Sequence, residues 1–197
     1  MEFTVKILTL ILLSLLLLGC GATQQERELG YTTHIDPYKN YQKYTALNAG
    51  YLDGQSLLSL QFLWLDIFAD VLDGEHSLWV AATLEGDHWQ FINPGESLVL
   101  MLDGKPLTLF SGTGSTLNRK VLSSRTIREK ALYKISPEIL EKIALASNVS
   151  LRLYGHQGYI ERSLSANHLI NYRAFYERFV MPRKDKFVNS TTVRTAQ

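Results

Sequence analysis

Cysteine is almost absent from this sequence, because Cys20 is the only one in 197 residues. A single cysteine cannot form a disulfide within the chain, so the fold must be stabilised by packing alone. Net charge is also nearly absent, at +1, and no basic stripe occurs, which argues against nucleic acid as a partner. The five histidines form neither a His-x-x-x-His pair nor an HExxH motif, so the common zinc signatures are missing.

The familiar catalytic motifs are missing as well. No Gly-x-Ser-x-Gly nucleophile motif occurs, and the glycine-rich loop at residues 111–115 lacks the residues that a phosphate-binding loop requires. Asp66 and Asp70 could act as a carboxylate pair, since they share a face in a helix and in a strand. Most such pairs, however, are solvated surface charges. We therefore expect no catalytic residues, no metal site and no cofactor.

A hydrophobic run long enough to span a bilayer is the third absence. The apolar run from Ile7 to Leu18 has roughly 12 residues, whereas a spanning helix needs about 20. Its length instead suits the apolar region of a secretory signal peptide, with Lys6 supplying the positive charge that precedes such a region. The run ends at Gly19, a small residue, and Cys20 follows directly.

The sequence Leu17-Leu18-Gly19-Cys20 resembles the lipobox of bacterial lipoproteins. The resemblance implies that residues 1–19 are a signal peptide cleaved between Gly19 and Cys20, and that Cys20 is lipidated on its sulfur and its new amine. Two or more acyl chains hold a protein stably at a bilayer, whereas one holds it only marginally. The lipid bilayer is therefore an expected partner through Cys20. The alternative is a buried thiol that follows an ordinary signal peptide.

The same resemblance has implications for location. In Gram-negative lipoproteins the residue after the cysteine directs sorting, and aspartate there retains the protein in the inner membrane. Gly21 occupies that position, which implies the periplasmic face of the outer membrane if the source is Gram-negative. Residues 20–30 are small and polar and are predicted to form a flexible tether with a reach of about 17 Å. The domain would then lie close to the membrane.

Residues 31–181 have the pattern of a single domain built mainly from strands. Asp-Gly pairs favour tight hairpin turns, so turns are predicted at the three Leu-Asp-Gly triplets, residues 52–54, 72–74 and 102–104. The third is the clearest, because an apolar run precedes it and an alternating apolar segment follows it, which predicts a hairpin. The segment 57–71 fits a helix or a strand with a bulge near Trp64, and we favour the strand. Further strands are expected at the following positions: 77–84, 88–92, 121–127, 131–135 and both arms of a hairpin over 149–164.

Two helices are expected, at about 136–147 and 165–181. Ser136 and Pro137 are typical of a helix start, and the second segment carries an aromatic stripe that suits docking on a sheet, although a partner or lipid surface could also bind it. The predicted fold is α+β, an antiparallel meander or sandwich-like sheet with two helices packed on it. Residues 182–197 carry a net charge of +3 (four basic residues minus Asp185) and are predicted to be a disordered tail.

Aromatic residues suggest one candidate binding site. A platform for a glycan or another small ligand would use Tyr38, Tyr41, Tyr44, Trp79 and Trp89, because these rings combine apolar surface with a polar group. The alternative is that the rings simply lie on the domain. The sequence therefore predicts a membrane-anchored, periplasm-facing lipoprotein with a non-catalytic accessory role, whose partner is an envelope protein. A glycan-binding or small-ligand-binding lipoprotein and a hydrolase of an envelope polymer are the alternatives.

Overall fold

The computed structural model describes residues 30–47, 51–52, 61–112 and 114–187. Its strands are β1 (Gly30–Asp36), β2 (Tyr41–Leu47), β3 (Tyr51–Leu52), β4 (Phe62–Leu72), β5 (Glu75–Gly86), β6 (Gly95–Leu102), β7 (Lys105–Ser111), β8 (Leu117–Ser123), β9 (Thr126–Ile135), β10 (Val149–Gly155) and β11 (Gly158–Ser163). Its helical elements are the 3₁₀ turn η2 (Gly114–Thr116), α2 (Pro137–Leu145), α3 (Ala166–Phe175), the π-helix η3 (Tyr176–Val180) and the 3₁₀-helix η4 (Met181–Lys186).

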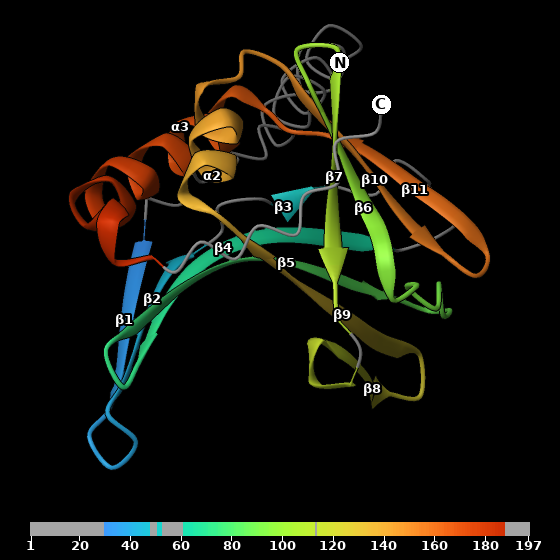
Figure 1. Ribbon diagram of the computed structural model, residues 1–197. Helices are drawn as coiled ribbons and strands as arrows, with labels where there is room; N and C mark the ends of the chain where they lie inside the picture. The colour runs from blue at the N-terminus through green and yellow to red at the C-terminus, as the bar shows by residue number, and fades with distance from the viewer. Residues whose placement is uncertain (1–29, 48–50, 53–60, 113, 188–197) are drawn as a thin grey trace, which may run out of the picture.

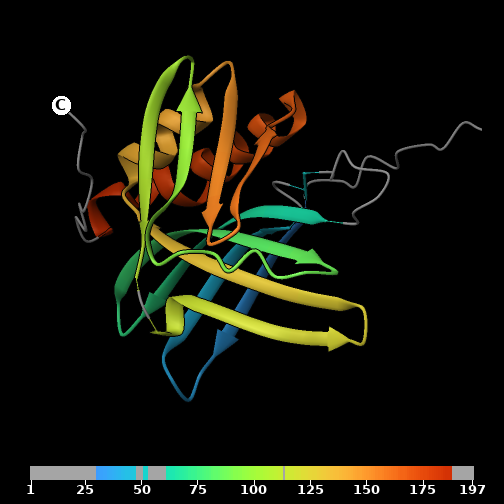
Figure 2. The same ribbon diagram turned by 90° about the vertical axis from the view of Figure 1, so that its right-hand side faces the viewer.

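The strands form one antiparallel sheet in the order β1-β2-β4-β5-β9-β7-β6-β10-β11, with β3 added to β4 and β8 added to β9. Strand β7 joins β9 through a single residue pair, Ser111 and Tyr133. The sheet bends at this junction into a large sheet (β1 to β5, β8 and β9) and a small sheet (β6, β7, β10 and β11). Figures 1 and 2 show the small sheet standing at a steep angle to the large one.

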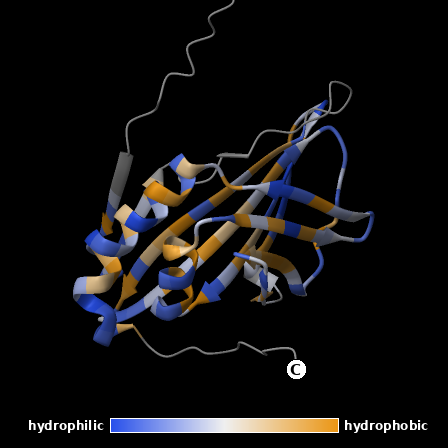
Figure 3. Cartoon of the chain, turned by 90° about the horizontal axis from the view of Figure 1, so that it is seen from above, coloured by the Kyte–Doolittle hydropathy of each residue, from blue (hydrophilic) through white to orange (hydrophobic). Residues whose placement is uncertain are grey.

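Both helices and the small sheet lie on the same side of the large sheet (Figures 1 and 2). The hydrophobic core fills the space between these layers, where Leu65, Tyr133 and Phe175 are at most 1 % exposed. Successive side chains of a strand point to opposite faces, and Figure 3 shows hydrophilic and hydrophobic residues interspersed along the strands. We call the side of the large sheet that points away from the helices the open face, because none of the described elements packs on it.

Strand β4 resolves the ambiguous segment 57–71 in favour of a strand that is described from Phe62 onward. Leu65 and its alternate neighbours are buried against the helices. Strand β4 pairs with β5 without a register shift along its whole length, so the bulge predicted near Trp64 is not present. The change of phase in the sequence arises because the open face also carries apolar residues, among them Phe68, which is 5 % exposed.

Two of the three Leu-Asp-Gly triplets close hairpins, which confirms that prediction. Asp73 and Gly74 have φ values of 52° and 85°, and Asp103 and Gly104 have values of 47° and 82°. Glycine and short polar residues tolerate this left-handed region best, and a two-residue turn needs it at both central positions. The third triplet, at residues 52–54, extends outside the described residues.

Helices α2 and α3 confirm the two predicted helices and, with the antiparallel sheet, the α+β fold. Helix α2 starts at Pro137, whose fixed φ suits the first helical position. Helix α3 starts with a capping box, in which Ser165 Oγ accepts from the backbone N of His168 and His168 Nδ1 accepts from the backbone N of Ser165. The hydroxyl of Tyr172 donates to the carbonyl of Leu65 at 2.6 Å and fixes α3 on β4.

Two strand predictions are corrected by the structure. The segment 88–92 is irregular and pairs with β10 only through the single bridge of Ile92 with Gly155, because the N–H groups of residues 90–92 bond the carboxylate of Glu129 instead of a neighbouring strand. The strands predicted at 121–127 and 131–135 correspond to β8 and β9, but β8 begins and ends earlier than predicted, β9 begins earlier, and the turn between them at residues 124–125 lies inside the first predicted strand. Hydrophobic alternation located these strands but not their ends.

The described chain continues past Met181, where the sequence placed the end of the domain. Helix η4 follows, and the buried Phe187 packs its ring edge-on against His76, with centroids 5.4 Å apart. The rest of the predicted tail, the signal peptide and residues 20–29 of the tether lie outside the described residues. Among the described helices, none has both the length and the apolar character needed to cross a membrane.

Candidate functional site

The open face carries, on the central strands of the large sheet, five half-buried charged residues that form no ion pair with a described residue, whereas Glu85 and Arg128 on the same face pair with each other. Strand β2 contributes one, β4 two and β9 two, and all are half-buried: Lys43, Asp66, Asp70, Lys130 and Lys134. Antiparallel pairing brings them together, since β2 and β9 flank the β4–β5 hairpin. Figure 1 shows β4 and β5 curving so that the open face lies on the inside of the bend. We call these five residues the open-face cluster.

The charges of the open-face cluster are near one another but unpaired. None of the five forms an ion pair with any residue in the part of the chain that the structure describes. The carboxylate of Asp66 also accepts no hydrogen bond from the described residues, and only the electrostatic attraction of Lys130 and Lys43 favours its charge. Asp70 has one donor, because Trp79 Nε1 lies 3.2 Å from its Oδ1.

Burial dominates the electrostatics of the cluster. It raises the pKa of Asp66 above the ordinary value of 3.8, and the attraction of Lys130 and Lys43 offsets only part of that rise. Burial also raises the pKa of Asp70, against the hydrogen bond from Trp79. For Lys43, burial lowers the pKa, and repulsion from Lys130 adds to the effect. Each of these charges is therefore less stable here than in water, a condition that is common at functional sites.

Two aromatic rings lie among the charges. Phe68 and Trp79 are paired across β4 and β5, and their rings stack with centroids 6.3 Å apart and planes 15° apart. Lys43 Nζ lies 3.8 Å from the Phe68 ring centroid and Lys134 Nζ lies 5.9 Å from that of Trp79. Cation–π attraction holds an ammonium group near a ring. The rings thus position these two lysines without neutralising them.

The five rings predicted to bind a ligand are spread over several places. Tyr41 and Trp79 lie on the open face. Tyr44 points to the opposite side and packs beneath η3. Tyr38 lies in the turn between β1 and β2 and is 98 % exposed, and Trp89 lies in the irregular segment before β6. The structure therefore does not gather the five into one platform.

The sequence identified only part of the open-face cluster. Asp66 and Asp70 were considered as a pair, and the structure places both on the open face of β4. The three lysines were missed because they become neighbours of the aspartates only through the order β2-β4-β5-β9. The available signal was the alternation of lysine with apolar residues at Lys130 and Lys134, but that pattern also describes an ordinary solvated strand.

A second polar site lies on the core side of β9. Glu129 is 1 % exposed, and its carboxylate accepts from the backbone N of Gln90 at 2.6 Å, of Phe91 at 2.9 Å and of Ile92 at 2.9 Å. Arg119 Nε lies 3.3 Å from the same carboxylate. The bonds hold Phe91 at a φ of 53°, which a bulky residue adopts only under constraint. We call this arrangement the Glu129 clasp, and its role is structural.

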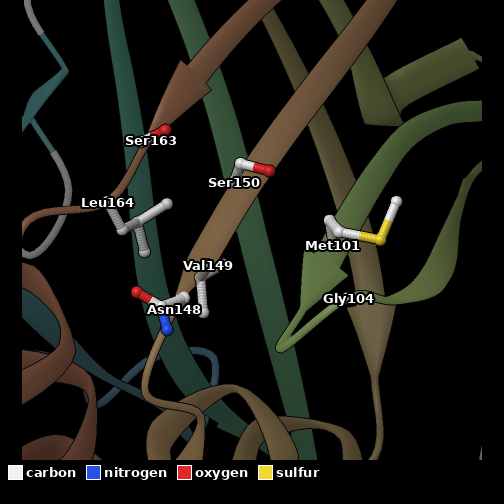
Figure 4. A pocket seen from close by; sticks show the side chains of 7 residues that line it. All are labelled: Met101, Gly104, Asn148, Val149, Ser150, Ser163 and Leu164. Carbon is white, nitrogen blue, oxygen red and sulfur yellow. The ribbon is translucent and has the colours of Figure 1, made fainter.

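A pocket of about 170 Å³ lies at the small sheet, beside the turn between β6 and β7 (Figure 4). Uncharged residues, both apolar and polar, line it: Met101, Gly104, Asn148, Val149, Ser150, Ser163 and Leu164. Pockets for drug-sized ligands usually measure about 300–1,000 Å³ and include well-placed polar groups. No lining residue is charged, so this pocket is a weaker candidate than the open face.

Within the described ranges, no three His, Cys, Asp or Glu side chains come together as a metal site would require. The predicted lipidation and cleavage residues, Cys20 and Gly19, lie outside those ranges. No protein-family model matches the chain, and neither the curated proteins nor the solved structures compared with it give a match.

Proposed function

We propose that the chain is a membrane-anchored, periplasm-facing lipoprotein that acts by binding a component of the cell envelope on its open face, without catalysing a reaction. The anchor rests on the lipobox-like sequence ending at Cys20. The observation that carries the binding role is the open-face cluster, a group of half-buried charges that have no ion-pair partner in the described chain.

The cost of these charges supports a binding role. A half-buried charge without a partner reduces stability, and a polar or apolar uncharged residue at the same strand position would avoid that loss. Other charges of the described chain do find partners, as Arg152 does with Glu161 on the small sheet and Arg128 with Glu85 at one end of the open face itself. Binding sites built on strands are also held more rigidly than those on loops. The open face combines charges that reduce stability with a rigid support of strands.

The spacing of the two aspartates supports binding over hydrolysis. Asp66 and Asp70 lie four residues apart on one strand, so their Cα atoms are about 13 Å apart at about 3.3 Å per residue. The two carboxyl groups of a glycosidase lie about 5–9.5 Å apart, so that both can reach one glycosidic bond. The hydrolase alternative therefore gains no support from this pair.

Mass spectrometry of the mature protein tests the anchor. We expect residues 1–19 to be absent and Cys20 to carry a diacylglycerol and an N-linked acyl chain. The Cys20→Ser variant should leave the membrane fraction, because serine offers no sulfur for the diacylglycerol that is proposed as the anchor. An unmodified thiol, or a serine variant that still fractionates with membranes, would contradict the anchor.

Site-specific photocrosslinking in cells tests the binding face. Thr83 and Thr108 are both half-buried residues in the middle of strands, but Thr83 lies on the open face opposite Lys130 and Thr108 on the outer surface of the small sheet. A photoreactive residue at position 83 should give a discrete adduct, and one at position 108 should not. Equal labelling from both positions, or none from position 83, would remove the open face as the binding surface.

A further inference from the structure

We infer that the open face binds a polysaccharide that carries carboxylate groups, with the lysines of the open-face cluster contacting its anionic groups and the aspartates accepting hydrogen bonds from its hydroxyls. The inference rests on the proposed function and specifies the chemistry of the same surface. Three observations support it: the distribution of the lysines, the aspartate oxygens that accept no hydrogen bond from the described residues, and the rings that lie among these charges.

The lysines favour an extended ligand with more than one negative charge. The cluster has three ammonium groups and two carboxylates, and none of them is neutralised by an ion pair in the described chain. Lys43 lies on β2 and Lys134 on β9, three strand positions apart in the sheet. At about 4.8 Å between strands, this separation is about 14 Å. A single small anion cannot contact both, whereas a polymer with repeated carboxylates can.

The aspartates favour a ligand that is also rich in hydrogen-bond donors. An ionised carboxylate can only accept hydrogen bonds. Asp66 has no hydrogen-bond partner among the described residues, and Asp70 has Trp79 as its side-chain donor. A ligand with negative charges alone would be repelled by these two groups. Sugar hydroxyls can donate to them while the carboxylates of the same chain approach the lysines.

The aromatic rings favour a sugar over an acidic peptide. Phe68 and Trp79 lie between Lys43 and Lys134, and Trp79 is half-buried, so part of its surface is accessible. An aromatic ring buries large apolar area in a fixed geometry while its polar group stays bonded, and the C–H faces of a sugar ring offer flat apolar surface of matching shape. Ligand sites typically combine such apolar surface with a few fixed polar groups.

Calorimetric titration of the full lipidated chain in detergent micelles tests the inference with three probes of matched length. Polygalacturonate supplies carboxylates and hydroxyls, dextran supplies hydroxyls alone, and poly-glutamate supplies carboxylates without sugar. We expect binding of polygalacturonate only. Lys130→Gln and Lys134→Gln should each weaken it at least about fivefold, and Asp66→Asn about threefold. Lys142→Gln, on helix α2 away from the open face, is the matched control and should leave the affinity unchanged.

Three results would overturn the inference. Absence of polygalacturonate binding would do so directly, and equal binding of dextran would show that the negative charges are not recognised. Poly-glutamate binding that depends on the same lysines would identify an acidic protein segment as the ligand. Crosslinking from position 83 distinguishes failure of this inference from failure of the proposed function. A protein adduct at that position would show that the open face is a binding surface and that its ligand is not a polysaccharide.

Discussion

Glu129 and Lys130 are consecutive residues of β9, yet they point to opposite faces of the large sheet and have opposite surroundings. Glu129 is 1 % exposed and accepts hydrogen bonds from three backbone N–H groups and Arg119. Lys130 is half-buried and forms no ion pair with a described residue. One strand thus supports a charge that is fully satisfied and a charge that is not.

The comparison of Glu129 with Lys130 distinguishes two kinds of charge. Glu129 stabilises the fold, whereas the charges of the open-face cluster reduce its stability. A buried carboxylate is stable only when donors surround it, and the Glu129 clasp meets that condition by ordering the segment before β6. In the open-face cluster the described residues do not surround the carboxylates with donors in this way. Burial therefore raises the pKa of Asp66 and of Asp70, which favours their neutral form. We therefore expect removal of charge to have opposite effects in the two places.

Neutralising the clasp should have the largest effect. The Glu129→Gln substitution keeps the shape of the side chain but turns an NH₂ group towards backbone donors that then lack an acceptor. We expect a loss of about 3 kcal/mol in the free energy of unfolding, measured by urea titration of the full chain. A loss below about 1 kcal/mol would show that the clasp is not needed by the fold.

The Gly155→Ala substitution should have the next largest effect, because it acts on the other contact of the same segment. A Cβ at position 155 would lie 2.3 Å from the carbonyl oxygen of Gln90, and backbone atoms must shift to relieve that overlap. We expect a loss of about 2 kcal/mol, typical of overpacking. The same urea titration measures it, and a variant as stable as the wild type would mean that the segment moves freely away from β10.

Neutralising the cluster should have a smaller effect of opposite sign. The Asp66→Asn variant removes a charge that burial disfavours, so we expect it to be more stable than the wild type at pH 7, by less than either loss described above. Thermal unfolding monitored by circular dichroism measures the change. A destabilised variant would indicate that Asp66 is held by partners and that its charge supports the fold.

The pH dependence sharpens this prediction. Because the pKa of Asp66 is raised in the folded state, the folded chain binds the proton more tightly than the unfolded chain does. The contribution of the Asp66 carboxyl to stability is therefore greatest below its unfolded-state pKa of about 3.8 and is lost as the pH rises through its folded-state pKa. The advantage of Asp66→Asn should be small near pH 4 and grow towards pH 7. An advantage that shrinks with rising pH would contradict the assigned cause.

The smallest effect is expected for an exposed ion pair. Arg152 and Glu161 face each other on the outer surface of the small sheet, and both are exposed. Pairs of this kind add little to stability because water and salt screen them. Glu161→Gln should leave the urea midpoint unchanged within error. A clear shift would mean that this exposed ion pair contributes measurably to the stability of the fold.

Local sequence signals were sufficient for the fold class, two of the hairpin turns and the two helices. Asp-Gly pairs at positions 73 and 103 located two hairpin turns, and Ser136 and Ser165 preceded the two helices. The segment 88–92 was not predictable from such signals, because its conformation depends on Glu129, which lies 37 to 39 residues away in the sequence. A tertiary hydrogen-bond partner there overrides a local pattern that alternates like a strand.

The candidate site was predictable only in part for a similar reason. Alternation along β4 was sufficient to place Asp66 and Asp70 on one face. The presence of Lys43 and Lys130 beside them depends on strand order, which no local signal encodes. Two of the five predicted aromatic rings show that residues close in sequence can also lie apart. Tyr41 and Tyr44 are separated by three positions, an odd number, so they point to opposite faces of β2.

The most direct test of the account is the unfolding free energy of a variant in which the whole open-face cluster is neutralised, with Lys43, Lys130 and Lys134 changed to Gln and Asp66 and Asp70 changed to Asn. These substitutions keep size and hydrogen-bonding capacity but remove every charge. If the charges serve binding, the variant should be at least as stable as the wild type. A loss of more than about 2 kcal/mol would show that the cluster holds the sheet together, and would contradict the central claim.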